Sequence, residues 1–236
     1  LMKLRMQITK DPEIRFISHL EYSRTISRAI RRAKLPAAYS EGFNPHLKFS
    51  LASALGVGVV SYTEFVEIEL AEPMEVELAA RALDKALPRG IRVLAADAVD
   101  THHAALMSQA AGAGYRVTLP FGKDISESVA AFNAAPELLF KKAAPKTKAG
   151  FKEIDVKFYI PHIDVTCNGE ETIFTFDCKI TPTGSMKAVD LLNALNEHYA
   201  LGLPVEMADI ERLNLYRLSK KGNKVPMLNN DAVKLA

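Results

Sequence analysis

One pattern of alternating apolar and polar residues occurs twice along the chain, and this repeat limits the possible folds more than any other feature. Strands alternate with a period of two residues, whereas helices repeat apolar residues every three or four positions. Ser18, followed three residues later by Glu21, forms a capping-box pattern that marks a helix start. The predicted elements of the first half are strand 4–9, helix 18–34, strands 47–52 and 63–70, helix 76–87 and strand 91–99.

The second half repeats this order less cleanly, with one additional strand between the two helices. Asn168-Gly169 is a strong signal for a two-residue hairpin turn, so the alternating segments around it are expected to pair. Two copies of strand–helix–strand–strand–helix–strand predict an α+β fold of tandem ferredoxin-like (split βαβ) domains. Each domain would have an antiparallel sheet with both helices on one face and the other face free. The predicted elements are strand 115–119, helix 125–134, strand 138–142, hairpin strands 154–160 and 174–180, helix 188–199 and strand 210–218.

Composition along the chain predicts the domain limits. We expect an N-terminal domain with a basic first helix over residues 1–100 and a C-terminal domain with the long hairpin over 114–218. A stretch of Ala, Gly and His joins them, and residues 219–236 are expected to form a polar, partly disordered tail. A lysine-rich loop over 143–150 is expected to be mobile.

The overall composition excludes several classes of protein. The chain has 236 residues, a formal net charge of +2, 48% hydrophobic and 25% charged residues, which is ordinary for a globular protein. Its two cysteines exclude a disulfide scaffold and a four-cysteine zinc or iron–sulfur site, and Cys167 and Cys178 are expected to be buried free thiols. His102-His103 has no further ligand at metal-binding spacing, so we expect no metal. With no apolar run of roughly 20 residues and no signal-peptide pattern, we expect a cytoplasmic protein without membrane contact.

Charge is distributed unevenly within the first predicted domain. Residues 1–50 contain ten basic and four acidic residues, a balance of +6. Residues 51–100 contain four basic and nine acidic residues, a balance of −5. This asymmetry indicates a positive face formed by the first part of the chain, although unlike charges could also neutralise one another after folding.

The first predicted helix and the loop after it contain the candidate binding residues. Arg24, Arg28 and Arg31 or Arg32 recur at spacings that place them on one helix face. The loop adds an aromatic ring, small polar groups and positive charge: Tyr39, Ser40, Asn44, His46 and Lys48. Forked arginine donors suit phosphate and an aromatic ring suits a base, so this pattern indicates single-stranded RNA or a nucleotide.

Two alternatives limit that interpretation. The arginine face could simply be solvated and pair with the acidic strand residues Glu64, Glu67 and Glu69. His19, in the first turn of the helix, is a weak candidate for a catalytic base, because a histidine there more often hydrogen-bonds a neighbouring loop.

A dense string of residues in the first third resembles the signature of a bacterial protein family. The string consists of Arg15–Glu21, Arg24, Arg28–Ala33, Leu35-Pro36 and Tyr39–His46, and the match extends through Ala54–Gly58 and Ser61–Phe65. It resembles the radical SAM-linked proteins, a domain of unknown function fused to or encoded beside cobalamin-binding radical SAM proteins. The resemblance implies a radical SAM partner that carries the iron–sulfur cluster, S-adenosylmethionine and cobalamin, with no cofactor on this chain.

Three functions are compatible with these features. The favoured one is a non-catalytic RNA- or nucleotide-binding module that works with a radical SAM partner in RNA modification or processing. The second is a metal-independent endoribonuclease, because tandem ferredoxin-like domains also resemble CRISPR repeat-RNA processing enzymes. The chain lacks the C-terminal glycine-rich loop of those enzymes, and the nearest candidate is Lys220–Lys224. The third is a protein-interaction domain that docks the radical SAM enzyme through a free sheet face.

Overall fold

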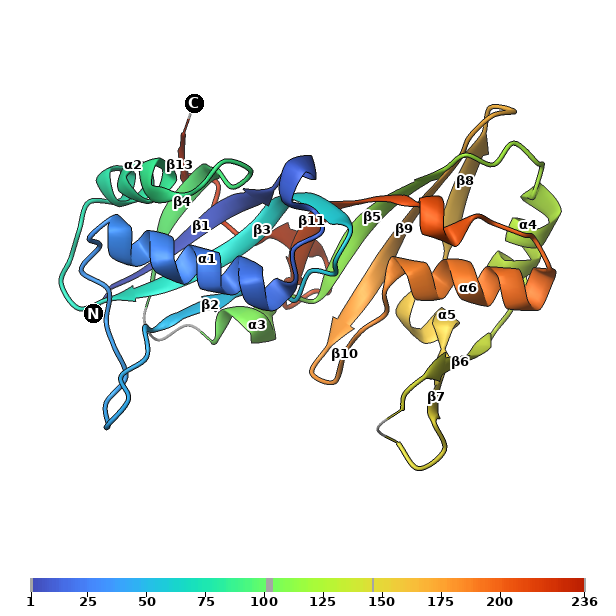
Figure 1. Ribbon diagram of the computed structural model, residues 1–236, viewed down its shortest axis with the longest axis horizontal. Coiled ribbons are helices and arrows are strands. Elements are labelled where there is room, and N and C mark those ends of the chain that lie inside the picture. Colours follow the sequence, from blue (N-terminus) through green and yellow to red (C-terminus); the bar gives the residue numbers. More distant parts are fainter. Residues whose placement is uncertain (1, 101–103, 146, 236) are drawn as a thin grey trace. The chain divides into compact units, whose positions relative to one another are not determined.

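The computed structural model describes residues 2–100, 104–145 and 147–235. It confirms an α+β fold with antiparallel strands, and the chain divides into two compact units (Figure 1). Unit 1 comprises the chain up to Ala111 and again from Asn214 onward. Unit 2 comprises Gly112–Leu213. The C-terminal residues therefore belong to the same unit as the N-terminal strand.

Unit 1 contains the predicted strand–helix–strand–strand–helix–strand order. The strands lie in the order β4-β1-β3-β2, each antiparallel to its neighbour, and β13 pairs with the outer edge of β4. A short 3-10 helix, η1 (Pro12–Ile14), precedes α1. The main elements are β1 (Met2–Lys10), α1 (His19–Arg32), β2 (Phe49–Leu51), β3 (Val59–Leu70), α2 (Val76–Ala86), β4 (Val93–Val99), α3 (Leu106–Gln109), β12 (Lys224–Pro226) and β13 (Val233–Lys234).

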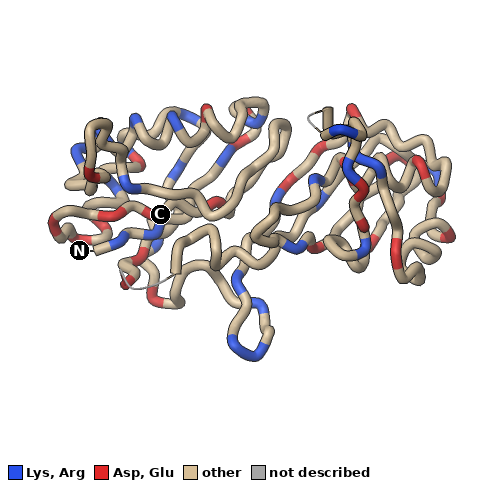
Figure 2. The backbone as a smooth tube through the Cα atoms, turned by 90° about the horizontal axis from the view of Figure 1, so that it is seen from below, with Lys and Arg blue, Asp and Glu red and all other residues tan. Residues whose placement is uncertain are grey.

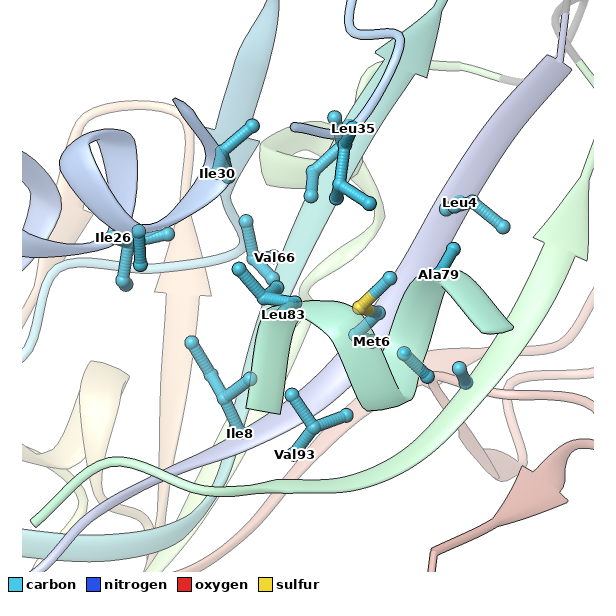
Figure 3. Packing of buried hydrophobic residues seen from close by; sticks show 14 of the residues in the cluster. Leu4, Met6, Ile8, Ile26, Ile30, Leu35, Val66, Ala79, Leu83 and Val93 are labelled. Atoms are coloured by element: carbon cyan, nitrogen blue, oxygen red, sulfur yellow. The ribbon is translucent and has the colours of Figure 1, made fainter. Parts of the chain in front are cut away.

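The hydrophobic core of unit 1 lies between the two long helices and one face of the sheet (Figure 3). Because side chains alternate along a strand, Leu4, Met6 and Ile8 of β1 all face this core. Ile26 and Ile30, four residues apart on α1, pack on the same core. The apolar periods read from the sequence therefore explain why both helices cover one face.

The opposite face of the unit 1 sheet differs from the expectation of a free face. Arg5 and Glu67 lie directly opposite each other in β1 and β3, and Arg5 Nη2 is 2.8 Å from Glu67 Oε2. Arg5 Nη1 also donates to the carbonyl of Met227 at 2.8 Å. Met227 and Leu228 are buried, so residues 219–235 are an ordered covering segment rather than a disordered polar tail. The buried charge pair needs this cover, which a count of polar residues does not reveal.

Unit 2 repeats the same strand order with an insertion. Its sheet runs β11-β5-β9-β8, and a separate two-stranded sheet, β6-β7, lies between α4 and β8 in sequence. β11 begins in this unit and ends in unit 1. The elements are β5 (Gly112–Leu119), α4 (Ser126–Ala134), β6 (Leu139–Ala143), β7 (Phe151–Asp155), α5 (Val156–Tyr159), β8 (Ile163–Cys167), β9 (Thr172–Thr181), β10 (Gly184–Ser185), α6 (Ala188–Tyr199), the 3-10 helix η2 (Val205–Met207) and β11 (Asp209–Leu218).

The prediction of a hairpin strand over residues 154–160 was wrong. The segment consists of the end of β7 and the short helix α5, and the true partner of β9 is β8. Val156 and Ile160 are both buried, and a spacing of four fits a helical turn as well as strand alternation. Asp155 accepts a hydrogen bond from the Lys157 amide at 3.0 Å and so caps the turn. This local capping favours the helix over a longer strand.

Both cysteines are free, but only one is buried. Cys167 is exposed at the end of β8 and lies opposite Thr172, whereas Cys178 lies opposite Ala113 of β5. The expectation of two buried thiols was therefore wrong for Cys167. Part of the predicted linker, including His102-His103, lies outside the described residues.

We predict that Met227→Ala lowers the free energy of unfolding by about 2–5 kcal/mol, because Met227 is buried and the change removes apolar contacts of the covering segment. Urea unfolding followed by circular dichroism measures this loss. Lys221→Ala, in the exposed turn before β12, is the control and should change the unfolding free energy by less than about 0.5 kcal/mol. Equal stability of the two variants would contradict the packing of the covering segment.

We predict that one thiol per native chain reacts quickly with a disulfide reagent at pH 8. Burial raises the pKa of Cys178 to about 11, so little thiolate forms and access is blocked. Cys167 is exposed and should react at once. Absorbance of the released thiolate counts the reacting groups. Unfolding should expose the second thiol, and Cys167→Ser should abolish the fast phase; a fast phase that survives this change would contradict the assignment.

Candidate functional site

The start of α1 is fixed by the predicted capping box. Ser18 Oγ accepts a hydrogen bond from the Glu21 amide at 3.2 Å, and Glu21 Oε2 accepts one from the Ser18 amide at 3.0 Å. The capping-box prediction is therefore confirmed. Hydrogen bonds from Ser18 lower the pKa of Glu21, with a smaller contribution from the charge of Arg24. The capping box therefore fixes the residue at which α1 begins.

Arg24, Arg28 and Arg31 lie together on the exposed face of α1. The buried positions Tyr22 and Ile26 point to the core, so residues on the opposite side of the helix point outward. Within the described part of the chain none of the three arginines forms a salt bridge. Their guanidinium groups are accessible to an anionic ligand. The distribution of Lys and Arg along the backbone is drawn in Figure 2.

The acidic residues of β3 pair with other bases. Glu67 binds Arg5 and also lies 3.5 Å from Lys3 Nζ, and Glu69 lies 3.1 Å from Lys48 Nζ. Among the described residues, Glu67 and Glu69 therefore do not pair with the α1 arginines, contrary to the alternative interpretation of the sequence. Glu64, the third acid of that set, is buried within β3.

Arg32 has a different role from the other helix arginines. Its Nη2 donates to the carbonyl of Ala86 at 2.8 Å, and its Nε donates to the same oxygen at 3.3 Å. Ala86 is the last residue of α2, where carbonyl groups lack partners within the helix. Arg32 therefore connects α1 to the end of α2, and Arg31 completes the exposed arginine face.

The loop after α1 is a narrow hairpin. Tyr39 bridges to Leu47, the Ser40 amide donates to the His46 carbonyl at 2.8 Å, and Ser40 Oγ accepts from the His46 amide at 2.9 Å. Ser40 thus braces the loop, while Asn44 and the side chain of His46 are exposed. At the base of the hairpin, Lys48 forms a salt bridge with Glu69.

Two aromatic rings on this hairpin are accessible. Tyr39 is 46% exposed, and Phe43 at the tip is fully exposed. Phe43 follows Gly42, whose φ of +112° is a conformation that glycine adopts without strain. Phe43 was missing from the predicted site residues, although an aromatic between Gly42 and Asn44-Pro45 in a turn was a usable signal.

His19 lies in the first turn of α1, as the sequence predicted, and its side chain is half-buried. Among residues 2–100, 104–145 and 147–235, no group of three or more His, Cys, Asp or Glu side chains could hold a metal ion. No helix in the same ranges is long and apolar enough to cross a bilayer.

The comparisons with known proteins identify the family. A family model described as "Uncharacterized protein conserved in bacteria (DUF2344)" matches residues 3–207. The chain belongs to this family. The match spans both units, and the family description assigns no activity. No curated protein matches the chain.

Three solved structures show limited similarity. A Cbf5-Nop10-Gar1 complex has 13% identity and a TM-score of 0.49, covering 90% of this chain and 48% of that chain. An archaeal box H/ACA sRNP Nop10-Cbf5 complex has 14% identity and a TM-score of 0.43, covering 89% and 46%. An unknown protein from Galdieria sulphuraria has 14% identity and a TM-score of 0.27, covering 89% and 96%. This chain thus spans about half the length of the first two.

We predict that Arg32→Ala lowers the free energy of unfolding by about 0.5–1 kcal/mol, because it removes the hydrogen bonds to the end of α2. Arg31→Ala, one residue earlier and facing solvent, should leave the unfolding free energy unchanged within about 0.3 kcal/mol. Denaturant unfolding of both variants measures the difference. A larger loss for Arg31→Ala than for Arg32→Ala would contradict the assigned roles.

Proposed function

We propose that this family member is a non-catalytic module that binds RNA or a nucleotide through unit 1 and presents it to a radical SAM partner. The observation that carries the proposal is the exposed face of α1, where Arg24, Arg28 and Arg31 form no salt bridge within the described residues. Other arginines of unit 1, such as Arg5 and Arg92, pair with carboxylates. A helix face that keeps three guanidinium groups available is suited to an anionic polymer.

The spacing of the arginines supports a phosphate backbone as the ligand. Arg24 and Arg28 are separated by about 6 Å of helix rise, which is comparable to the separation of neighbouring phosphates in an extended strand. Each guanidinium offers paired donors to phosphate oxygens. The face can therefore contact consecutive phosphates without reading the base sequence.

The hairpin after α1 supplies the groups expected for contact with bases. Tyr39 and Phe43 present exposed rings on which unpaired bases can stack. Asn44 and His46 offer hydrogen bonds, and Lys48 adds charge at the base of the hairpin. Exposed aromatic rings on a braced loop favour single-stranded over double-stranded RNA, because bases in a duplex are already stacked.

The proposed partner supplies chemistry that this chain does not contain. A radical SAM cluster requires several cysteine ligands, and the whole chain has two cysteines. The iron–sulfur cluster, S-adenosylmethionine and cobalamin are therefore assigned to the partner, and this chain is assigned substrate binding. The resemblance of Arg15–Glu21 and Tyr39–His46 to radical SAM-linked proteins supports this assignment.

We further propose that each unit is a ferredoxin-like domain. The orders β4-β1-β3-β2 and β11-β5-β9-β8 place corresponding strands at corresponding positions. In both units the first and third strands of the motif are central and antiparallel. The β6-β7 pair and α5 are then an insertion between the first helix and the second strand of unit 2.

We predict that Arg24→Glu/Arg28→Glu weakens binding of a single-stranded RNA by at least about tenfold at 50 mM salt, because two charge-assisted phosphate contacts are lost and repulsion is added. Fluorescence anisotropy of a labelled oligonucleotide measures the dissociation constant. The wild-type protein should also bind less tightly at 200 mM salt, since phosphate contacts release counterions.

The matched control is Arg81→Glu/Lys85→Glu on the exposed side of α2, which changes the net charge by the same amount. It should weaken RNA binding far less than the α1 variant. An equal loss in both variants would show that only overall charge matters. Absence of RNA binding by the wild-type protein would refute the RNA-binding function, and loss of radical SAM partner binding in the α1 variant would favour protein docking.

A further inference from the structure

Unit 1 contains a cleft of about 360 Å³ on the sheet face opposite α1 and α2. Gln7 lies directly opposite Phe65 in the β1–β3 register, and Thr63 is two residues from Phe65, so these three side chains share one sheet face. Residues from β11 and the covering segment form the other walls. All lining residues belong to unit 1.

The interior of the cleft is apolar and built from well-packed side chains. Phe65, Leu215 and Met227 are each at least nine-tenths buried, and Leu228 lies beside Met227 in the same wall. Tyr216 adds a partly exposed ring. Walls of this kind accept a flat, weakly polar ring and exclude water from it.

Two polar groups at the cleft have unused hydrogen-bonding capacity. Gln7 Nε2 donates to the Tyr62 carbonyl at 2.8 Å, which orients the amide and leaves Oε1 as an acceptor. Thr63 Oγ1 is buried without a hydrogen-bond partner among the described residues. A buried hydroxyl without a partner is costly, so a ligand that supplies an acceptor here gains affinity.

The rim of the cleft is basic. Lys224 lines the cleft, with its Nζ 4.8 Å from the centre of the Tyr216 ring. Lys220 and Lys221 are exposed in the turn immediately before it. Hydrogen bonds between Ser219 and Asn223 close this turn, which joins directly to Lys224 of the cleft wall. The combination fits a phosphate next to an apolar ring.

We infer that this cleft binds a nucleotide, with its base between Phe65 and the covering segment and its phosphate at Lys220 and Lys221. Gln7 Oε1 accepts from an exocyclic amine, and the Thr63 hydroxyl donates to the adjacent ring nitrogen. Adenine and cytosine present that pair of groups, whereas uracil presents a carbonyl and an N–H. The ligand is either a free nucleotide or the terminal nucleotide of an RNA.

This site deepens the proposed function, because it assigns the nucleotide to residues distinct from the α1 face. The primary test is isothermal titration of the wild-type protein with AMP, UMP and inorganic phosphate alone. AMP should bind, UMP should bind at least about tenfold more weakly, and phosphate alone should not bind measurably. AMP that binds no better than UMP, or not at all at millimolar concentration, would overturn the inference.

Two variants examine the two ends of the ligand. Thr63→Val keeps the shape of the side chain and should weaken AMP binding several-fold without lowering stability, because it removes a hydroxyl that has no partner. Lys220→Glu/Lys221→Glu should weaken AMP but leave adenosine, which has no phosphate, unaffected. The variant Arg81→Glu/Lys85→Glu is the charge control. Unchanged AMP affinity in both cleft variants would also overturn the inference.

The same measurements separate this site from the RNA-binding face. Arg24→Glu/Arg28→Glu should retain AMP binding, so a protein that binds AMP but no RNA would refute only RNA binding by the α1 face. A protein that binds RNA but no nucleotide would refute only the cleft. Competition experiments distinguish the two sources of the nucleotide, with free AMP added to complexes with RNA oligonucleotides that end in adenosine or in uridine. If AMP displaces only the RNA that ends in adenosine, the cleft binds an RNA terminus. If AMP displaces neither RNA, the cleft binds the free nucleotide.

Discussion

The buried ion pair between Arg5 and Glu67 determines how unit 1 is closed. Arg5 is only 3% exposed, and a guanidinium at that depth is strongly destabilising unless each charge is compensated. Glu67 provides the opposite charge across the strand pair, and the Met227 carbonyl accepts a further hydrogen bond. The N-terminal strand therefore requires the C-terminal covering segment. The same segment forms a wall of the cleft in which we place a nucleotide.

The two units use one strand order for different surfaces. In unit 1, Tyr22 and Ile26 of α1 are spaced so that both face the core. Arg24, Arg28 and Arg31 lie on the opposite side of the same helix and therefore face solvent. In unit 2 the β6-β7 insertion follows α4, and its Lys142 is held by Asp190 of α6. The exposed arginine face is thus a direct consequence of the apolar period that builds the core of unit 1.

Sequence periodicity was sufficient for the parts of the fold that depend on local pattern. The α1 capping box, the helix faces and the antiparallel α+β class follow from spacing and capping chemistry. The covering segment was missed because its packing depends on a charge pair more than 150 residues away in sequence, between Arg5 and Glu67. Residues 154–160 were misread because buried positions four apart fit both periods. Arg31 and Arg32 are adjacent in sequence, and only the position of α2 distinguishes their roles.

Unit 1 is formed by two segments of the chain that are separated in sequence by unit 2, so its parts are synthesised at different times. Unit 2 is a continuous segment, Gly112–Leu213, and is complete before the residues that finish unit 1 are made. On the ribosome the first β-strands of unit 1 must keep the Arg5 guanidinium hydrated until Met227 and β13 emerge. The inserted unit can thus fold first, and closure of unit 1 is a late, long-range step whose rate is limited by joining segments from the two ends of the sequence.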